Sequence, residues 1–342
     1  MLPATATHLF EYRVVGCGEL AWHRLGKWAV SGGRVAAVFK STFYVDLGGD
    51  LGSDLGGEMV CVVGADCASA PLNLISDVPR TVCWPSHGLA CGMTVRLSQN
   101  GMIVDERFRF HLDGARVWRP PPPPQCPSQA TLRIGLSALR ETLEVRAPDA
   151  GLARSLCRPA SASVGDRRRQ RDRALLEAVA RALSDTVRDG PLAASVTEFA
   201  ALLDLVGRGD GLTPSGDDFI GGVMLALHAA GRLGLRDQIR DAVLAVATYR
   251  TNAISLAHLT CAAQGLAAEP VHNLIHAVMV ADIGEITSIA DDIDQLGHTS
   301  GWDIVAGVAC ALAFVAGGQD TARKTASRTN TLAAKSDAMW RQ

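Results

Sequence analysis

In the sequence of 342 residues we expect neither a secretory signal nor a membrane-spanning segment. Its first residues, MLPATATHLFEYR, contain no basic stretch followed by an apolar stretch, so they predict no secretory signal. The most apolar run, residues 304–316, is shorter than the about 20 residues that a helix needs to cross a bilayer. We therefore expect a cytoplasmic protein with no membrane partner, in which this run forms a buried helix.

The chain also lacks a net positive charge, and it has few aromatic side chains and no closely paired cysteines. The formal net charge is −2, and the chain has only three Tyr, six Trp and eight Phe. Without a positive field or stacking platforms, we expect no nucleic-acid partner. The nine cysteines are odd in number, irregularly spaced and never arranged as Cys-x-x-Cys. This spacing favours reduced, mostly buried thiols over a disulfide framework or a zinc site.

The first 119 residues have the pattern of a β-rich domain. Short apolar or alternating runs occur at residues 34–45, 57–63, 94–97, 101–104 and 107–112. Turn signals separate these runs, and Asn100-Gly101 between two of them is typical of a hairpin. Closely spaced strands with few helices between them favour an antiparallel sheet that forms a sandwich or a barrel.

The pattern changes after a proline-rich linker at residues 120–127. Five prolines at 120–124 require an extended backbone, which marks a domain boundary. Residues 128–317 then show helical periodicity, and a polar tail follows at 318–342. We expect helices at 130–145, 171–188, 195–206, 219–232, 236–264, 270–280, 283–294 and 303–315. The predicted fold class is therefore α+β, with a mainly α-helical C-terminal domain.

A cluster of five arginines lies at residues 167–173, beside Asp166 and Asp172. It is too local to indicate nucleic-acid binding. It is typical of a solvated helix start, and the alternative is a surface that recruits anions or a partner.

The most informative segment is residues 207–222, GRGDGLTPSGDDFIGG. Glycines followed by Pro214, a predicted N-cap at Ser215 and a carboxylate at Asp218 are typical of a loop that leads into a helix. The N-terminus of a helix offers backbone N–H groups and a positive dipole end, which suits phosphate or carboxylate. No Gly-Lys-Ser/Thr sequence is present, so a nucleotide-binding loop of the common type is excluded.

A second segment repeats this pattern at residues 297–312, GHTSGWDIVAGVACAL. The sequence Ser-Gly-x-Asp-x-x-x-Gly-Val-x-x-Ala-Leu begins at Ser215 and again at Ser300. Gly222 and Gly307 lie in corresponding helix interiors, where glycine costs about 1 kcal/mol relative to alanine. We therefore expect the two helices to cross closely at these glycines, with their N-termini converging on one anionic ligand.

A polar segment between the two motifs is expected to complete the site. On a continuous helix over residues 236–264, Thr251, Ser255 and His258 share one face. His272 and His276 have the spacing of metal ligands on a helix, but no partnering Glu makes a metalloprotease-like pattern.

Taken together, GxGLTPSGDD, Thr-x-x-x-Ser and GHTSGWD resemble the family of the AllH subunit of oxamate carbamoyltransferase, from anaerobic allantoin breakdown. The resemblance is strong over residues 207–227 and 297–312, fair over 248–272 and weak in the N-terminal half. The charged residues Arg208 and Asp210 depart from the family pattern. The resemblance implies the reaction of oxalurate with phosphate to give oxamate and carbamoyl phosphate, in a complex with other carbamoyltransferase subunits.

Several residues are therefore candidates for the site. Candidate catalytic residues are Asp217, Asp218, His298 and Asp303. Candidate substrate-binding residues are Gly211, Thr213, Ser215, Gly216, Thr251, Ser255, Thr299, Ser300 and Gly301. The expected ligands are phosphate, carbamoyl phosphate and a ureido acid, without a cofactor or resident metal.

Two alternatives stay open at this stage. In one, the chain is a non-catalytic scaffold subunit whose glycines and caps serve packing. In the other, it is a phosphotransferase or hydrolase in which Asp217, Asp218 and Asp303 bind Mg²⁺.

Overall fold

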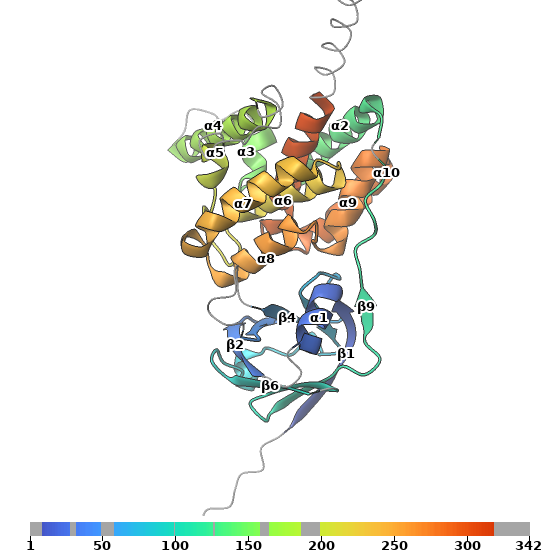
Figure 1. Ribbon diagram of the computed structural model, residues 1–342, viewed down its shortest axis with the longest axis vertical. Coiled ribbons are helices and arrows are strands. Elements are labelled where there is room, and N and C mark those ends of the chain that lie inside the picture. Colours follow the sequence, from blue (N-terminus) through green and yellow to red (C-terminus); the bar gives the residue numbers. More distant parts are fainter. Residues whose placement is uncertain are drawn as a thin grey trace, which may run out of the picture. The chain divides into compact units, whose positions relative to one another are not determined.

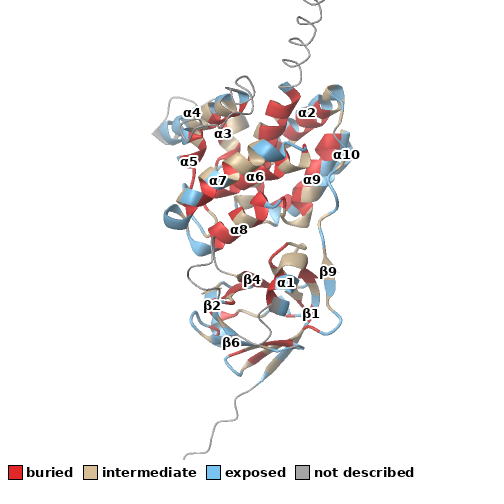
Figure 2. Ribbon diagram, in the orientation of Figure 1, coloured by how far each residue is buried: buried red, intermediate tan, exposed pale blue. Residues whose placement is uncertain are grey.

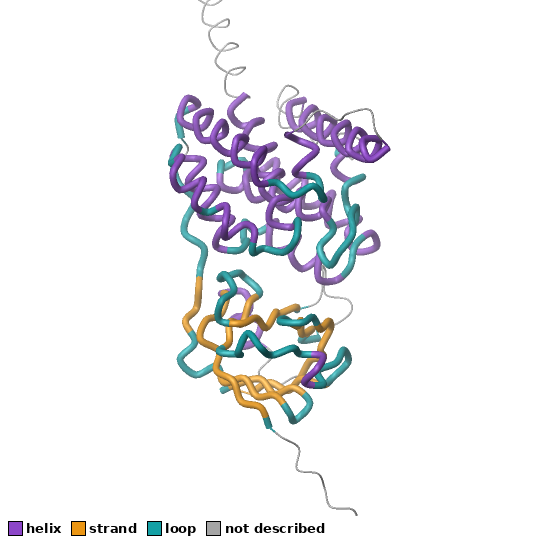
Figure 3. The backbone as a smooth tube through the Cα atoms, turned by 180° about the vertical axis from the view of Figure 1, so that it is seen from behind, coloured by secondary structure: helices purple, strands orange, loops and turns teal. Residues whose placement is uncertain are grey.

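The computed structural model describes residues 9–27, 32–48, 58–98, 100–125, 127–157, 164–185 and 199–317. The chain divides into two units (Figures 1 and 3). Unit 1 comprises Met1–Pro122, Gly211–Thr213 and Leu244–His272. Unit 2 comprises Pro123–Asp210, Pro214–Val243 and Asn273–Gln342. The first segment of unit 1 ends within the predicted proline-rich linker, but two short segments of the helical half also belong to this unit.

Unit 1 contains a sheet in which nine strands follow the order β5-β4-β3-β2-β6-β7-β8-β1-β9 among the described residues. The strands are β1 Phe10–Gly18, β2 Gly32–Val38, β3 Phe43–Asp46, β4 Met59–Gly64, β5 Asn73–Ser76, β6 Thr94–Ser98, β7 Gly101–Val104, β8 Phe108–His111 and β9 Arg116–Trp118. An additional pairing between β5 and β1 closes the sheet into a barrel, since β1 also pairs with β8. The hairpin predicted at Asn100-Gly101 is confirmed, because Ser98 pairs with Gly101.

The barrel is mixed, so the prediction of a purely antiparallel sheet is wrong in part. Strand β1 runs parallel to both β8 and β9, and β4 runs parallel to β5. The other pairings are antiparallel. Parallel and antiparallel strands show the same alternation of apolar and polar residues. The sequence pattern therefore does not indicate the direction of a neighbouring strand that is distant in the chain.

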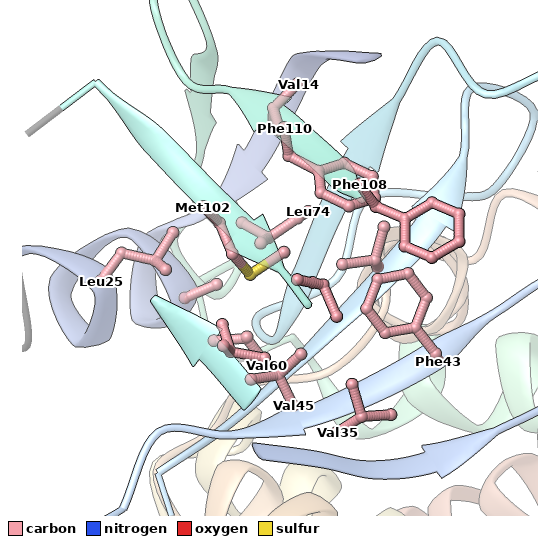
Figure 4. Close-up of a cluster of buried hydrophobic side chains, with 14 of the residues drawn as sticks. Val14, Leu25, Val35, Phe43, Val45, Val60, Leu74, Met102, Phe108 and Phe110 are labelled. Carbon is pink, nitrogen blue, oxygen red and sulfur yellow. The ribbon is translucent and has the colours of Figure 1, made fainter. Parts of the chain in front are cut away.

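Large apolar side chains fill the barrel (Figure 4). Phe43, Phe108 and Phe110 are fully buried, and their rings surround the indole of Trp84 at centroid distances of 5.0, 5.8 and 6.1 Å. Val35, Val45 and Val60 come from β2, β3 and β4 and lie in the same cluster, as Figure 4 shows. Burial of this aromatic and β-branched set is the main stabilising contribution to the barrel.

The described residues of unit 1 also form short helices, namely α1 Glu19–Lys27, the 3-10 helix Pro85–His87 and α8 Ala253–Ala263. Helix α8 packs on the strands through two apolar clusters. Ile254 lies with Tyr44 and Cys61, and Ala257 lies in the second cluster with Met59. Strands near the N-terminus therefore share their apolar surface with a helix almost two hundred residues later in the chain.

Unit 2 is helical. Its helices are α2 Gln129–Arg146, α3 Ala153–Cys157, α4 Val164–Asp185, α5 Ala200–Leu203, α6 Ser215–Ala229, α10 Ile283–Ser288, α11 Ala290–Asp294 and the helix Ser300–Gly317. Two further helices, α7 Leu233–Arg250 and α9 Glu269–Val280, contain residues of both units. The predicted α+β fold class is thus confirmed, with a barrel of strands and a mainly helical remainder.

The helix expected over residues 236–264 is broken into α7 and α8, which corrects that prediction. Asn252 is the N-cap of α8, and its side-chain oxygen accepts from the N–H groups of Ile254 and Ser255 at 3.0 Å each. Asparagine is a favoured N-cap residue, so it starts a new helix where apolar periodicity alone runs on.

The two helices that carry the duplicated motif form the centre of unit 2. Every residue of α6 from Ser215 to Leu227 is buried (Figure 2). The helix Ser300–Gly317 is long and apolar enough to cross a membrane by length and composition, but 78% of that window is buried inside the protein. This burial agrees with the predicted buried helix.

Candidate functional site

The N-terminus of α6 differs from the predicted cap. Ser215 is the first helical residue, and the N-cap is Pro214, with φ −57° and ψ 138° and no side-chain cap hydrogen bond. The prediction of Ser215 as N-cap is therefore wrong, although proline does fix the backbone at the helix start. The hydroxyl of Ser215 interacts instead with the carboxylate of Asp303.

Backbone groups of the preceding loop close this helix start. We call residues 207–211 the glycine loop; its three glycines have φ values of 74°, 122° and 108°, which favour glycine. The Gly216 N–H donates to the carbonyl oxygen of Arg208 at 2.8 Å, and the Asp217 N–H donates to that of Pro214 at 2.9 Å. The predicted role of the Gly216 N–H as an anion donor is therefore not supported by this conformation.

Asp217 holds the other end of the same loop. Its Oδ1 accepts from the Gly207 N–H at 2.8 Å, and its side chain is 2% exposed. A buried carboxylate that accepts from a backbone N–H stabilises a turn. Asp217 thus has a structural partner at the point where the chain enters the glycine loop.

The second helix start has a different surrounding. Gly297, with φ 87°, turns the chain into residues 298–299, and the helix begins at Ser300. The Asp303 N–H donates to the carbonyl oxygen of Thr299 at 2.9 Å. The indole of Trp302 is 3% exposed and donates to Asp294 of α11 at 2.7 Å. Trp302 therefore fixes this helix start against the preceding helix.

The two motif helices cross at their glycines, as predicted. A Cβ on Gly222 would overlap the carbonyl oxygen of Ile304 and lie 3.0 Å from the Val308 N. A Cβ on Gly307 would overlap the carbonyl oxygen of Phe219 and lie 2.9 Å from the Val223 N. In the alignment of the two motifs these contacts are equivalent and reciprocal. The duplicated sequence therefore builds a crossing with local two-fold symmetry, in which backbones touch.

Asp303 lies where the two helix starts meet, and it is fully buried. Its Oδ1 accepts from the N–H groups of Leu152 and Ala153 at 2.6 and 3.0 Å. Burial raises the pKa of Asp303, and hydrogen bonds from Ser215, the two backbone N–H groups and Thr299 oppose that rise. Gly151, with φ 82°, packs directly on the carboxylate, and a Cβ there would lie 2.7 Å from both oxygens. Asp303 thus anchors the segment before α3 to the second motif.

The predicted site residues fall into two groups. Those in unit 2 are Ser215, Gly216, Asp217, Asp218, His298, Thr299, Ser300, Gly301 and Asp303. Within this group His298 is exposed, Thr299 and Ser300 are half-buried, and the other members are buried. The side chains of the group that meet solvent therefore come from the second helix start.

The remaining predicted residues, Gly211, Thr213, Thr251 and Ser255, belong to unit 1. Asn252 donates to the carbonyl oxygen of Leu212 at 2.7 Å and so ties the residue that follows the glycine loop to the start of α8. The prediction that Thr251 and Ser255 share a helix face is wrong, because α7 and α8 are separate helices.

His258 lies beside the barrel, within unit 1. Its Nε2 is 3.2 Å from the hydroxyl of Tyr44, and burial, with a smaller contribution from Arg24, lowers the pKa of His258 to about 4. The ring is therefore neutral near pH 7 and serves the packing of α8.

Metal binding finds no support in the part of the chain that the structure describes. No group of three or more His, Cys, Asp or Glu side chains gathers there in an arrangement suited to a metal ion. The alternative in which Asp217, Asp218 and Asp303 jointly hold Mg²⁺ is accordingly not supported. His272 accepts from the Ala267 N–H at 3.1 Å, which is a structural role.

Sequence reasoning missed two contributors from outside the motifs. One is the segment of Gly151, Leu152 and Ala153 that wraps Asp303, for which no sequence signal exists. The other is Asp172 of α4, which binds the guanidinium of Arg208. Its signal was present, because Asp172 continues the helical spacing of Leu176 and Val179 and so falls on the inward face.

Comparison with known proteins agrees with the resemblance noted in the sequence. Residues 205–312 match the family model described as oxamate carbamoyltransferase subunit AllH. These are 108 of the 342 residues, and they include both motifs, the helix crossing and α8. The resemblance to this family is therefore confirmed for this segment. No solved structure matches the chain.

Proposed function

We propose that this chain is a cytoplasmic subunit of a carbamoyltransferase that acts on a ureido acid such as oxalurate and works with other subunits. The observation that carries the proposal is the two-fold helix crossing, which the duplicated motif builds within the segment similar to AllH. Two helix N-termini that meet provide a positive dipole end on each side, which suits reactants that are all anions.

The reaction proposed is the phosphorolysis of a carbamoyl–nitrogen bond. A phosphate oxygen attacks the carbamoyl carbon of oxalurate, and the bond from that carbon to the amide nitrogen breaks. The nitrogen takes up a proton and leaves as oxamate, while the carbamoyl group leaves as carbamoyl phosphate. Catalysis of such a step requires donors for the anions, an acceptor for the carbamoyl NH₂ and a proton source for the leaving nitrogen.

The second helix start supplies the donors in this proposal. Thr299 and Ser300 are half-buried, and the Gly301 N–H lies in the first turn of the helix. Gly211, Thr213, Thr251 and Ser255 belong to unit 1, so the proposed anion contacts are limited to residues of unit 2. The first helix start contributes its dipole, since its Gly216 N–H is bonded to Arg208.

Asp218 and His298 have the chemical roles in this proposal. Asp218 is 7% exposed and lies in the first turn of α6, where it would orient the carbamoyl NH₂. His298 is exposed on the turn before the second helix and would protonate the leaving nitrogen. Asp217 and Asp303 are assigned positioning roles, because each already accepts from backbone N–H groups.

A second candidate function is that of a non-catalytic subunit in the same complex. It is favoured by the hydrogen bonds that Asp217, Asp303 and the Gly216 N–H form with the protein backbone, because groups bonded in this way stabilise the fold. In that case Asp218→Asn lowers the free energy of unfolding by about 1 kcal/mol and leaves turnover of the complex unchanged.

Isothermal calorimetry on the purified full chain tests the proposal. The probes are phosphate, carbamoyl phosphate, oxamate and oxalurate, and the variants are Asp218→Asn and Ser300→Ala. Matched controls are Asp241→Asn and Ser184→Ala, which change exposed residues of α7 and α4. Binding that both motif variants abolish and both controls retain supports the substrate-binding role. Equal binding in all variants contradicts the site, and absence of binding by the wild-type chain favours the non-catalytic subunit.

A further inference from the structure

A buried carboxylate lies outside the segment similar to AllH, on helix α4. Asp172 is 5% exposed and begins the inward stripe that continues with Leu176, Val179 and Leu183, all nearly inaccessible. A carboxylate on an apolar face is costly to bury unless a partner compensates for its lost hydration. The identity of this partner reveals what the residue does.

The partner is Arg208, at the second position of the glycine loop. Asp172 Oδ1 accepts from Nη2 of Arg208 at 2.7 Å and from Nε at 3.2 Å. The main chain of the same arginine closes the start of α6, since its carbonyl oxygen accepts from the Gly216 N–H. The Arg208 Cβ lies 3.2 Å from the position that a Cβ on Gly216 would take. Arg208 is thus held at its side chain by α4 and at its carbonyl by α6.

The glycine loop depends on such an anchor. Three of its five residues are glycines with positive φ, and glycine has a larger conformational entropy to lose than other residues. The side chain of Asp210 at its end is 99% exposed and lies 3.9 Å from the exposed Arg168, a pair that adds little. Asp217 holds the first residue of the loop through the Gly207 N–H, and the buried Asp172 holds the next residue through the guanidinium of Arg208, whose side chain is 40% exposed.

We infer that Asp172 is a positioning residue that holds the glycine loop against the start of α6 through Arg208. Gly209 of the loop lies over Ser215, because a Cβ on Gly209 would be 2.7 Å from the Ser215 N. Ser215 in turn contacts Asp303 at the meeting point of the two motifs. The consequence for ligand binding rests on the proposed function, whereas the consequence for the loop does not.

Hydrogen exchange of the full-length chain tests the positioning role. The variant is Asp172→Asn, which cannot neutralise the guanidinium, and the matched control is Glu177→Gln, which removes the exposed pair with Arg173 on the same helix. We expect exchange at Gly207 and Gly216 to accelerate at least about tenfold in Asp172→Asn, with little change on the inward face of α4. The control is expected to match the wild type. Unchanged exchange in the loop, or equal acceleration throughout unit 2, overturns the inference.

A second variant keeps the test decisive if Asp172→Asn fails to fold. Arg208→Lys keeps the positive charge beside Asp172 but loses the two N–H groups that bind one oxygen. We expect Arg208→Lys to fold and to show the same local acceleration of exchange at Gly207 and Gly216. Asp172→Glu keeps a carboxylate at this position, so its amides are expected to exchange more slowly than those of Asp172→Asn. Wild-type protection in Arg208→Lys contradicts the role of the guanidinium.

Calorimetry with inorganic phosphate separates the two proposals. If the wild type binds phosphate, Asp172→Asn is expected to weaken the affinity about tenfold, and Glu177→Gln to leave it unchanged. Equal affinity in Asp172→Asn and the wild type overturns the functional part of the inference. If the wild type does not bind while loop exchange responds as expected, the positioning role stands and the proposed substrate site fails.

Discussion

The two helix starts share one motif but have different surroundings. At Ser215 the chain arrives through the glycine loop, and the loop carbonyl of Arg208 takes the Gly216 N–H. At Ser300 the chain arrives through a short turn with an exposed histidine, and Trp302 fixes the helix to α11. The part that both copies share is the crossing of Gly222 and Gly307 on opposing backbone. The motif therefore specifies how the helices meet, while residues outside it decide what each helix start presents to solvent.

The largest effect is expected at the crossing, where the two copies are equivalent. Gly222→Ala and Gly307→Ala each place a Cβ against a backbone carbonyl of the opposing helix, so each lowers the free energy of unfolding by about 3 kcal/mol or more. Denaturant unfolding measures both losses. Gly234→Ala in α7 is the control, since nothing lies within 4 Å of its Cβ, and it is expected to stabilise by up to about 1 kcal/mol. If alanine at either glycine leaves the free energy of unfolding unchanged, the two helices do not cross with equivalent backbone contacts.

The buried carboxylates are expected to differ in their contribution to stability. Asp303→Ala leaves two backbone donors without an acceptor, at Leu152 and Ala153, and lowers the free energy of unfolding by about 2–4 kcal/mol. Asp217→Ala leaves one, at Gly207, and costs about 1–3 kcal/mol. The same unfolding measurement compares them. A larger loss for Asp217→Ala reverses the ranking and indicates that the first helix start is the more constrained.

The pH dependence of stability sharpens the comparison at Asp303. Its pKa is raised in the folded state above the ordinary value of 3.8, so the folded protein binds this proton more tightly than the unfolded chain does. The free energy of unfolding therefore falls as pH rises from the unfolded pKa through the folded pKa, and the full cost is present above that value. Asp303→Asn lacks this dependence. Unfolding of both proteins from about pH 4 to about pH 7 is expected to show the wild type losing stability relative to the variant.

The smallest effect on stability is expected at His298. The side chain is exposed, so His298→Gln changes the free energy of unfolding by no more than about 0.5 kcal/mol. If His298 protonates the leaving nitrogen, turnover of the reconstituted complex falls about 100-fold or more. Steady-state kinetics with oxalurate and phosphate measure this loss. Full turnover in the variant removes His298 from the chemistry and leaves the second helix start as a binding element.

Local sequence patterns predicted much of the fold. The hairpin at Asn100-Gly101 and the crossing glycines were visible because turns and helix interiors have strong residue preferences. The parallel pairing of β1 with β8 was not visible, since it joins segments about a hundred residues apart with no local signal. The break at Asn252 was overlooked because apolar periodicity continues across it.

The site was predictable only in part, for a similar physical reason. The motif residues lie near one another in sequence, and their capping and glycine preferences indicated paired helix starts. Which N–H groups stay available depends on what the rest of the chain brings to them. The wrap at Gly151 and the carboxylate of Asp172 reach the motifs by tertiary packing, and the conformation of the glycine loop brings the Arg208 carbonyl back to the Gly216 N–H. The sequence of residues 207–222 and 297–312 alone does not indicate these contacts.

The return of the chain to unit 1 at Leu244–His272 has a consequence for synthesis on the ribosome. Tyr44, Cys61 and Met59 emerge early, whereas Ile254 and Ala257 of α8, which pack with them, emerge about two hundred residues later. At about 5–20 residues per second, this interval is roughly 10–40 s. During that time the nascent barrel exposes an apolar patch to solvent. A fragment ending at the proline run keeps this patch exposed permanently, so a chaperone is expected to bind the fragment and release the full-length chain.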